Sequence, residues 1–299
     1  MSLSKPSNCA VQLIPESEVN QNNKSIYCDY NEAFIGYDEI RQPHGLQCIL
    51  NIFQQSEVPL EKQIVLEGGF GTGAYLDKIR HHVKKIYGVE GSDEGYQQTK
   101  KKVNNAANVN LRIGNILGLP FPGKLFHSYL VNQVLHHLDH SNHFQQLDVF
   151  LAESIRVLKP GGNLVINTCS QDQLDPETGS YWHYKYFPAA AEAIRKRYLP
   201  IKELEARLAS LGFTEIKRTI PTKKIFRKDY YKDPYIALQP EFRLGDSAYS
   251  FLSAAELDVS NKGLMEAIDD GSVRREMHLF AERAGQIGET VIISAHRMS

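Results

Sequence analysis

Three glycines at alternate positions, Gly69, Gly71 and Gly73, follow a short apolar run and precede a stretch with helical spacing. Glycine lets the backbone turn tightly and approach a ligand closely. Two acidic residues accompany this turn, with Glu67 just before it and Glu90 at the end of the next apolar run. A carboxylate at the position of Glu90 can accept hydrogen bonds from both hydroxyls of a ribose. The pattern therefore predicts a site for a nucleoside-containing ligand.

The position of Glu67 narrows the choice of ligand. The pyrophosphate of a dinucleotide would lie at the N-terminus of the helix after the glycines, where a nearby carboxylate repels it. The turn also satisfies the dinucleotide pattern Gly-x-Gly-x-x-Ala, which ends at Ala74. Even so, Glu67 favours a ligand with an ammonium group and a sulfonium centre, and thus S-adenosylmethionine over a nicotinamide cofactor.

Alternating strands and helices must position these residues. Short apolar runs predict strands, and segments with helical periodicity lie between them, one of them capped by Ser92. This order is typical of an α/β protein, and we expect a seven-stranded, mostly parallel Rossmann-like sheet with helices on both faces. The expected strands are residues 64–66, 86–90, 110–113, 126–131, 164–168, 214–219 and 290–294.

The remaining segments complete the expected organisation. Residues 1–25 are polar and are interpreted as a flexible leader, and residues 26–299 as a single domain. Within it we expect an N-terminal helical cap at 26–60, a Rossmann-like core at 61–220 and a mainly helical insertion at 222–287. The insertion precedes the final strand at 288–299 and would act either as a lid over the site or as a cover for a sheet edge.

Composition limits the classes of partner. The formal net charge is -1, so the chain lacks the overall positive charge typical of nucleic-acid binding. It has no run of about 18 apolar residues that would span a bilayer. Its four cysteines, Cys9, Cys28, Cys48 and Cys169, show no zinc-ligand spacing, and no metal is expected. We therefore expect a cytoplasmic monomer or homodimer that binds neither nucleic acid nor membrane.

Five segments in this order resemble the class I S-adenosylmethionine-dependent methyltransferases, and most closely their small-molecule branch. They span just over a third of the chain. The segments are VLEGGFGTG at 65–73, YGVE at 87–90, GNI at 114–116 with LPF at 119–121, QVLHHL at 133–138 and RVLKPGG at 156–162. Two positions differ from the commoner family residue, because Glu67 and Asn115 each stand where Asp is usual. Both keep an acceptor oxygen.

The resemblance implies roles for particular residues. The cofactor's amino-acid end would lie near Glu67, its ribose on Glu90, and its adenine beside Asn115 and Ile116. Asn132 and the candidate catalytic residue Gln133 would face the transferred methyl group, and Arg41 on the cap would pair with the methionine carboxylate. The full set of implied cofactor contacts is Glu67, Gly69, Phe70, Gly71, Glu90, Gly91, Asn115, Ile116, Asn132, Tyr30 and Arg41.

The acceptor side is less defined by the sequence. Gln133, His136 and His137 follow the fourth strand, and an imidazole could serve as a base, although a structural role for each histidine is an open alternative. An aromatic segment after the fifth strand would wall an acceptor pocket or simply pack a loop. Its candidate substrate contacts are Tyr181, Trp182, His183 and Tyr186.

These observations predict transfer of a methyl group from S-adenosylmethionine, which leaves S-adenosylhomocysteine, to a small-molecule acceptor by in-line displacement. O- or N-methylation is favoured because both are common in the branch that the chain resembles. Three alternatives stay open. They are a C-methyltransferase of the same fold, a nicotinamide-dependent oxidoreductase and a non-catalytic S-adenosylmethionine-binding module.

Overall fold

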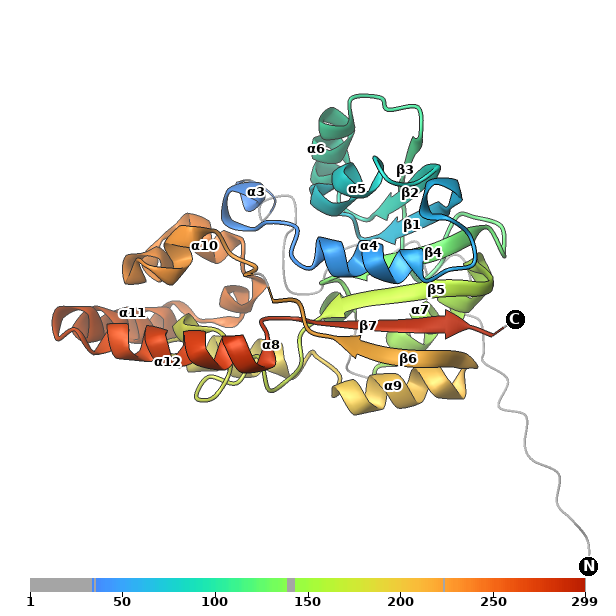
Figure 1. Ribbon diagram of the computed structural model, residues 1–299. Helices are drawn as coiled ribbons and strands as arrows, with labels where there is room; N and C mark the ends of the chain where they lie inside the picture. Colours follow the sequence, from blue (N-terminus) through green and yellow to red (C-terminus); the bar gives the residue numbers. More distant parts are fainter. Residues whose placement is uncertain (1–33, 35, 139–142, 223, 299) are drawn as a thin grey trace, which may run out of the picture.

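The computed structural model describes residues 34, 36–138, 143–222 and 224–298. Its centre is a seven-stranded sheet with the strand order β3-β2-β1-β4-β5-β7-β6 (Figure 1). The strands are β1 (Ile64–Gly68), β2 (Lys85–Glu90), β3 (Val109–Ile113), β4 (Phe126–Asn132), β5 (Leu158–Thr168), β6 (Phe213–Thr219) and β7 (Val291–Arg297).

The sheet is mostly parallel, as the sequence predicts. Strands β1 to β5 pair in parallel, while β7 lies antiparallel to both β5 and β6. The strand order reverses beside β1, because the chain moves outward to β2 and β3 and then returns to β4 on the other side. Ligands of open α/β sheets bind at such a reversal, beyond the carboxyl ends of the strands.

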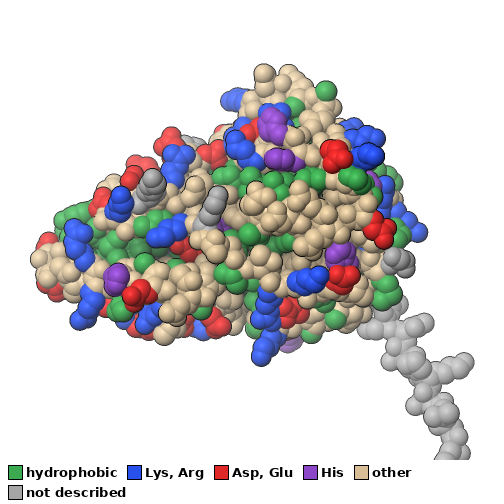
Figure 2. All heavy atoms as spheres, in the orientation of Figure 1, with side chains coloured by type: hydrophobic (Ala, Val, Ile, Leu, Met, Phe, Trp, Pro, Cys, Tyr) green, Lys and Arg blue, Asp and Glu red, His purple; other side chains and the backbone are tan. Residues whose placement is uncertain are grey.

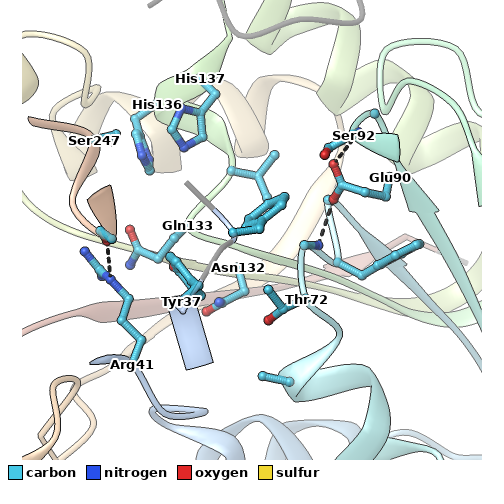
Figure 3. A pocket seen from close by; sticks show the side chains of 18 of the residues that line it. Tyr37, Arg41, Thr72, Glu90, Ser92, Asn132, Gln133, His136, His137 and Ser247 are labelled. Carbon is cyan, nitrogen blue, oxygen red and sulfur yellow. Dashed lines mark hydrogen bonds between the residues drawn. The ribbon is translucent and has the colours of Figure 1, made fainter. Parts of the chain in front are cut away.

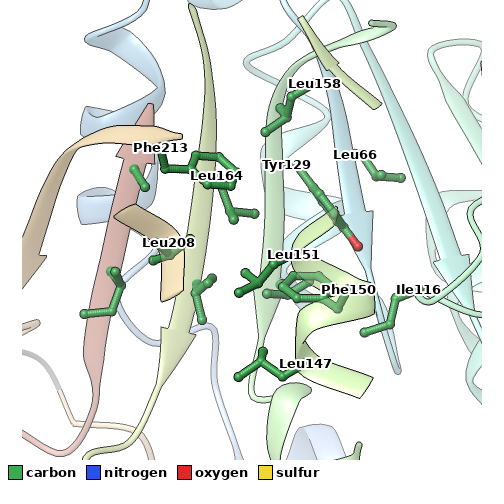
Figure 4. Packing of buried hydrophobic residues seen from close by; sticks show 14 of the residues in the cluster. Leu66, Ile116, Tyr129, Leu147, Phe150, Leu151, Leu158, Leu164, Leu208 and Phe213 are labelled. Atoms are coloured by element: carbon green, nitrogen blue, oxygen red, sulfur yellow. The ribbon is translucent and has the colours of Figure 1, made fainter. Parts of the chain in front are cut away.

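Helices cover both faces of the sheet. Neighbouring strand residues point to opposite faces, so Val65 packs with the cluster that includes Phe53 of α4, while Leu66 packs with the cluster that includes Phe150 of α7 (Figure 4). The helices of the first face are α4 (Leu46–Gln54), α5 (Ala74–Ile79) and α6 (Asp93–Val103). Those of the second face are α7 (Gln145–Val157) and α9 (Ile201–Ser210).

Strand β5 begins earlier than the sequence indicates. The KPGG segment reads as a turn before a strand at residue 164, but pairing with β4 already starts at Leu158. The register then shifts between Phe126 and Ser128, and Gly161 adopts a left-handed φ of 72°. Because glycine tolerates that conformation, the chain can turn locally and resume regular pairing at Asn163.

The helical insertion and the segment after β5, residues 169–198, together form a lobe with a hydrophobic core of its own, beside the sheet (Figure 1). Its aromatic centre includes Trp182, Phe226, Tyr230 and Phe242, and further residues from the segment after β5 join them. Its helices are α8 (Pro188–Arg195), α10 (Pro240–Leu244), α11 (Ala254–Asp269) and α12 (Ser272–Ile287), with short 3-10 turns at Trp182–Lys185, Lys228–Tyr231, Pro234–Leu238 and Ser247–Phe251.

Within the described residues, the N-terminal cap contains α3 (Tyr37–Ile40) and α4, which residues 41–45 separate. Gly45 precedes α4 with a φ of 72°. The cap joins the insertion through backbone hydrogen bonds, from Gln42 N–H to the Ile225 carbonyl and from Arg227 N–H to the Ile40 carbonyl. The predicted leader and Tyr30 lie outside the described residues.

Charged side chains of both signs are interspersed on the face shown in Figure 2. Within the described ranges, no helix is both long and apolar enough to cross a bilayer. The same part of the chain contains no group of three or more His, Cys, Asp or Glu side chains arranged to hold a metal ion.

Candidate active site

A cavity of about 720 Å³ lies beyond the carboxyl ends of β1, β2 and β4. The sheet, the cap and the insertion all contribute to its wall. Every described residue implied in cofactor binding lines this one cavity: Glu67, Gly69, Phe70, Gly71, Glu90, Gly91, Asn115, Ile116, Asn132 and Arg41. Its volume falls in the range of about 300–1,000 Å³ typical of small-molecule sites.

The glycine turn brings backbone close to the cavity. Gly69 has a φ of 66°, and a Cβ atom there would lie 2.5 Å from Cγ2 of Val134. Gly73 has a φ of 74° and precedes α5. The turn therefore requires glycine at position 69 both for its backbone conformation and for the close approach of Val134.

Hydrogen bonds to the Glu90 side chain hold the glycine turn against the end of β2. The Glu90 Oε2 accepts a hydrogen bond of 2.7 Å from Gly71 N–H, and its Oε1 accepts one of 2.9 Å from Ser92 N–H (Figure 3). Burial raises the pKa of Glu90, and the backbone N–H donors of Ser92 and Gly71 oppose that rise. Each carboxylate oxygen keeps further acceptor capacity, which suits a ligand with two neighbouring hydroxyls.

Glu67 is unusual among the polar residues of the cavity wall because its carboxylate is buried and incompletely hydrogen-bonded. It is only 1% exposed, and its Oε2 has no hydrogen-bond partner among the described residues. Burial raises its pKa well above the usual range, the negative charge of Glu90 adds to the rise, and Lys102 opposes it. An unpartnered buried carboxylate is costly to maintain, and a cationic ligand that donates hydrogen bonds would satisfy it.

Asn115 and Ile116 lie between β3 and the cavity. The Asn115 Oδ1 accepts a hydrogen bond of 2.9 Å from Leu117 N–H, so part of its acceptor capacity already shapes the local turn. Ile116 is buried and packs beside Gly68, where an added Cβ would lie 2.9 Å from its Cγ2. The apolar surface of Ile116 is thus fixed at the cavity wall.

Asn132 ends β4 and Gln133 follows it, and hydrogen bonds hold both side chains. Asn132 Oδ1 accepts a hydrogen bond of 2.6 Å from the Asn167 amide, and Gln133 Oε1 accepts one of 3.0 Å from the Tyr198 hydroxyl. Gln133 has an uncommon positive φ of 53°, and its N–H donates to the Asn167 carbonyl. Non-glycine residues held in this conformation are found at functional sites more often than elsewhere.

His136 and His137 lie side by side on the cavity wall, with ring centroids 3.8 Å apart (Figure 3). His136 also stacks on Tyr198 at 4.6 Å. Burial lowers the pKa of both imidazoles, to about 3 for His137, and Arg197 and Arg41 add to the decrease. Both rings are therefore neutral at physiological pH, and His137 is a weak base there.

The aromatic segment after β5 divides into two groups. Tyr181 lines the cavity, and so does Tyr184, which the sequence analysis did not single out. Trp182, His183 and Tyr186 do not line it, which corrects their predicted role as substrate contacts. They pack instead within the insertion lobe, where the Trp182 Nε1–H donates to the Tyr230 carbonyl at 3.1 Å. Burial of such large rings stabilises the lobe by about 1.5–3 kcal/mol each.

His183 lies one layer behind the cavity in a buried hydrogen-bond network. Its Nδ1 is 2.8 Å from the Tyr230 hydroxyl and its Nε2 is 3.2 Å from Asp246 Oδ2. The Tyr184 hydroxyl also donates to Asp246. Burial alone would raise the pKa of Asp246, but the hydrogen bond from His183 and the charge of Arg41 outweigh burial and lower it. Asp246 therefore stays ionised at the cavity wall.

Sequence reasoning missed several residues that line the cavity. Tyr198 carries no local signal, since it follows α8 and reaches Gln133 only through the fold. Asp246 and Ser247 lie in a segment with a distinctive sequence and no assignable chemistry. Their polarity beside the apolar residues around them is the one signal that marks them.

Comparison with solved structures identifies the fold. A putative methyltransferase from an antibiotic biosynthesis pathway of Anabaena variabilis superposes with a TM-score of 0.63 at 19% identity, over 84% of this chain and 95% of that one. The geranyl diphosphate C-methyltransferase of Streptomyces coelicolor, solved with S-adenosyl-L-homocysteine, has a TM-score of 0.51 at 16% identity, over 85% and 78%. The fold is that of the class I, Rossmann-like methyltransferases.

Sequence comparison agrees with the fold. Residues 66–166 match a family described as a methyltransferase domain. An uncharacterized methyltransferase of Anoxybacillus flavithermus is 27% identical over 62% of this chain and 84% of its own length. The demethylmenaquinone methyltransferase of Tropheryma whipplei is 31% identical over 34% of this chain and 40% of its own. Sequence and structure comparisons thus agree on a methyltransferase fold, with a methyltransferase-domain match over residues 66–166.

Proposed function

We propose that this protein binds S-adenosylmethionine in the cavity described above and transfers its methyl group to a small-molecule acceptor, with oxygen or nitrogen as the favoured methylated atom. The observation that carries the proposal is the unpartnered, buried carboxylate of Glu67 beside a glycine turn fastened by Glu90. A C-methyltransferase of the same fold is the alternative, and the Streptomyces coelicolor neighbour is a C-methyltransferase.

The residues present fit the cofactor at each of its parts. Glu67 would accept hydrogen bonds from the ammonium group, and Glu90 would accept them from the ribose hydroxyls. Asn115 and Ile116 would hold the adenine through an acceptor oxygen and an apolar surface. S-adenosylmethionine supplies a methyl group on a positively charged sulfur, and the carboxylates of the wall favour that cation electrostatically.

The chain's own contribution to transfer is alignment and exclusion of water. Asn132 and Gln133 lie between the ribose side and the acceptor side of the cavity, and hydrogen bonds to Asn167 and Tyr198 fix their positions. The neutral rings of His136 and His137 can accept a hydrogen bond from an acceptor O–H or N–H. Because the pKa of His137 is about 3, it would orient that proton rather than remove it before transfer.

The size of the cavity and its enclosure by the insertion support a small acceptor. Ile225, Phe226 and Leu244 of the insertion line it, together with Tyr181 and Tyr184. The net charge of -1 and the interspersed surface charges also favour a small molecule over nucleic acid (Figure 2). We infer a cytoplasmic monomer or homodimer that acts away from membranes.

Calorimetric titration with S-adenosylhomocysteine, with NAD and NADP titrated in parallel, tests the proposal. We expect saturable binding of S-adenosylhomocysteine alone. Glu90→Ala should weaken it by about 100-fold or more, because a buried carboxylate's charged hydrogen bonds contribute about 1.5–3 kcal/mol each. Glu57→Ala, at an exposed position away from the cavity, is the matched control. Binding of a nicotinamide cofactor instead would overturn the proposal.

A further inference from the structure

The charges on the cavity wall are unevenly distributed. Five acidic residues line it: Asp38, Glu67, Glu90, Asp93 and Asp246. Of the described lining residues, Arg41 is the single lysine or arginine. Most of the wall is thus suited to a cation, and an anionic group that enters the cavity finds one fixed positive charge.

Arg41 is fixed in place on three sides. Its Nε–H donates to the Gly245 carbonyl at 2.9 Å, and its guanidinium carbon lies 4.8 Å from the ring centre of Phe226 and 5.7 Å from that of Tyr37. Among the described residues, its two terminal nitrogens have no hydrogen-bond partner. A rigid guanidinium with covered faces and free terminal donors is preorganised for an acidic group.

The carboxylate of Asp246 does not use these donors. Asp246 interacts with Arg41 electrostatically, but its oxygens accept hydrogen bonds from His183, Tyr184 and the Ala248 N–H. No ion pair within 4 Å joins Arg41 to a carboxylate in the described part of the chain. The charge of Arg41 is therefore balanced at a distance and remains available to a ligand.

Arg41 also lies away from the cofactor end. Figure 3 shows it, with Ser247, on the side of the pocket opposite to Glu90 and Ser92. The positive charge of Lys102 opposes the raised pKa of Glu67, whereas the positive charge of Arg41 lowers the pKa of Asp246. A methionine carboxylate would lie one carbon away from the ammonium group that Glu67 is proposed to hold, so we expect it nearer to Glu67 than to Arg41.

We propose that Arg41 binds an acidic group of the acceptor, so that the substrates are small acids, carboxylates or phosphates, with an apolar or aromatic body. The body would lie against Tyr181, Tyr184, Phe226 and Leu244, which surround this end of the cavity. This inference rests on the proposed function. It reassigns Arg41 from the cofactor, as the sequence resemblance implied, to acceptor recognition.

The first part of the test asks whether Arg41 binds the cofactor or the acceptor. S-adenosylhomocysteine and 5′-methylthioadenosine, which lacks the amino-acid end, are titrated into wild type and Arg41→Gln. We expect the ratio of the two affinities to change by less than about threefold. A loss of about tenfold or more for S-adenosylhomocysteine alone would overturn the inference, because Arg41 would then hold the methionine carboxylate.

The second part measures acid recognition. Phenylacetate, 3-phenylpropanoate and phenyl phosphate are compared with phenylacetamide and 2-phenylethylamine as ligands of the S-adenosylhomocysteine complex. We expect at least one acid to bind about tenfold or more tightly than the amide and the amine, with the preference lost in Arg41→Gln and partly kept in Arg41→Lys. If no acid binds more tightly than the amide, the inference is wrong.

Arg243→Gln is the matched control. Like Arg41, Arg243 donates to a backbone carbonyl, that of Ala237, and lies over two aromatic rings. It belongs to the insertion lobe and does not line the cavity. The substitution should leave acid recognition unchanged. If S-adenosylhomocysteine does not bind at all, the proposed function fails, and the acid panel is then run on the ligand-free protein, where the same comparison decides the role of Arg41.

Discussion

The two ends of the cavity hold their charges by different means. At the sheet end, the Glu90 carboxylate accepts hydrogen bonds from backbone N–H groups of Gly71 and Ser92. At the insertion end, the Asp246 carboxylate is held mainly by the side chains of His183 and Tyr184. Backbone donors depend on chain conformation, whereas side-chain donors depend on segments that meet only in the fold. The first kind of site therefore tolerates few changes of conformation, and the second few changes of packing.

The largest expected effect comes from Gly69→Ala at the sheet end. The new Cβ would lie 2.5 Å from Val134 at a φ of 66°. Strain and overpacking together should cost about 2–4 kcal/mol of unfolding free energy, and S-adenosylhomocysteine affinity should fall about 100-fold.

Gly161→Ala is the control for backbone strain alone, since Gly161 has a φ of 72° and nothing within 4 Å of the Cβ position. It should cost about 1 kcal/mol and leave ligand affinity unchanged. Denaturant unfolding and calorimetry measure both variants. If Gly69→Ala and Gly161→Ala lower the unfolding free energy equally, the close approach of Val134 is not the reason why the turn requires glycine at position 69.

At the insertion end, His183→Ala should lower stability and spare the cofactor. It removes one hydrogen-bond partner of the buried Asp246, leaves the Tyr230 hydroxyl without its partner and removes a packed ring. We expect a loss of about 2–3 kcal/mol in unfolding free energy and a change of less than about threefold in S-adenosylhomocysteine affinity. A large loss of affinity would mean that the two ends of the cavity are coupled rather than separate.

Among the substitutions in the cavity wall and its supporting network, Glu67→Gln has the smallest expected effect on stability, and it should stabilise the fold while weakening ligand binding. Burial raises the pKa of Glu67 above its usual 4.5, so the fold loses stability as pH rises from that usual value towards the raised pKa, because the carboxyl ionises more readily in the unfolded chain. The variant should therefore be more stable than wild type, by about 1–2 kcal/mol near pH 8 and by less near pH 4.5.

The same substitution should weaken S-adenosylhomocysteine about tenfold, because the ammonium group loses its charged partner. Thermal unfolding at several pH values and calorimetry together check the prediction. A variant that is less stable than wild type near pH 8 would contradict the proposed cost of the buried carboxylate.

The contrast between local backbone contacts and distant side-chain contacts also explains which parts of the protein could be predicted from the sequence. The sheet and the cofactor residues could be predicted because Gly69, Glu67 and Glu90 lie close together in sequence and follow strands recognisable by their apolar runs. Trp182 and His183 were misplaced because an aromatic segment reads alike whether it lines a cavity or fills a core. Their burial against Tyr230 and Phe226 depends on contacts across more than 40 residues, as the separation of 48 between Trp182 and Tyr230 shows. Asp246 and Tyr198 depend on similar distant contacts.

Asp38 on the cap gives the cavity a sensitivity to ionic strength. Its carboxylate accepts a hydrogen bond from the Thr72 hydroxyl at 2.6 Å and pairs with Lys102, while its backbone carbonyl accepts one from Arg227 of the insertion. One cap residue therefore ties the glycine turn to the lobe. The pair with Lys102 is partly exposed, so dissolved salt screens it. We expect added salt to loosen the cap and to speed the departure of S-adenosylhomocysteine, so that turnover limited by product release would rise with salt before affinity is lost.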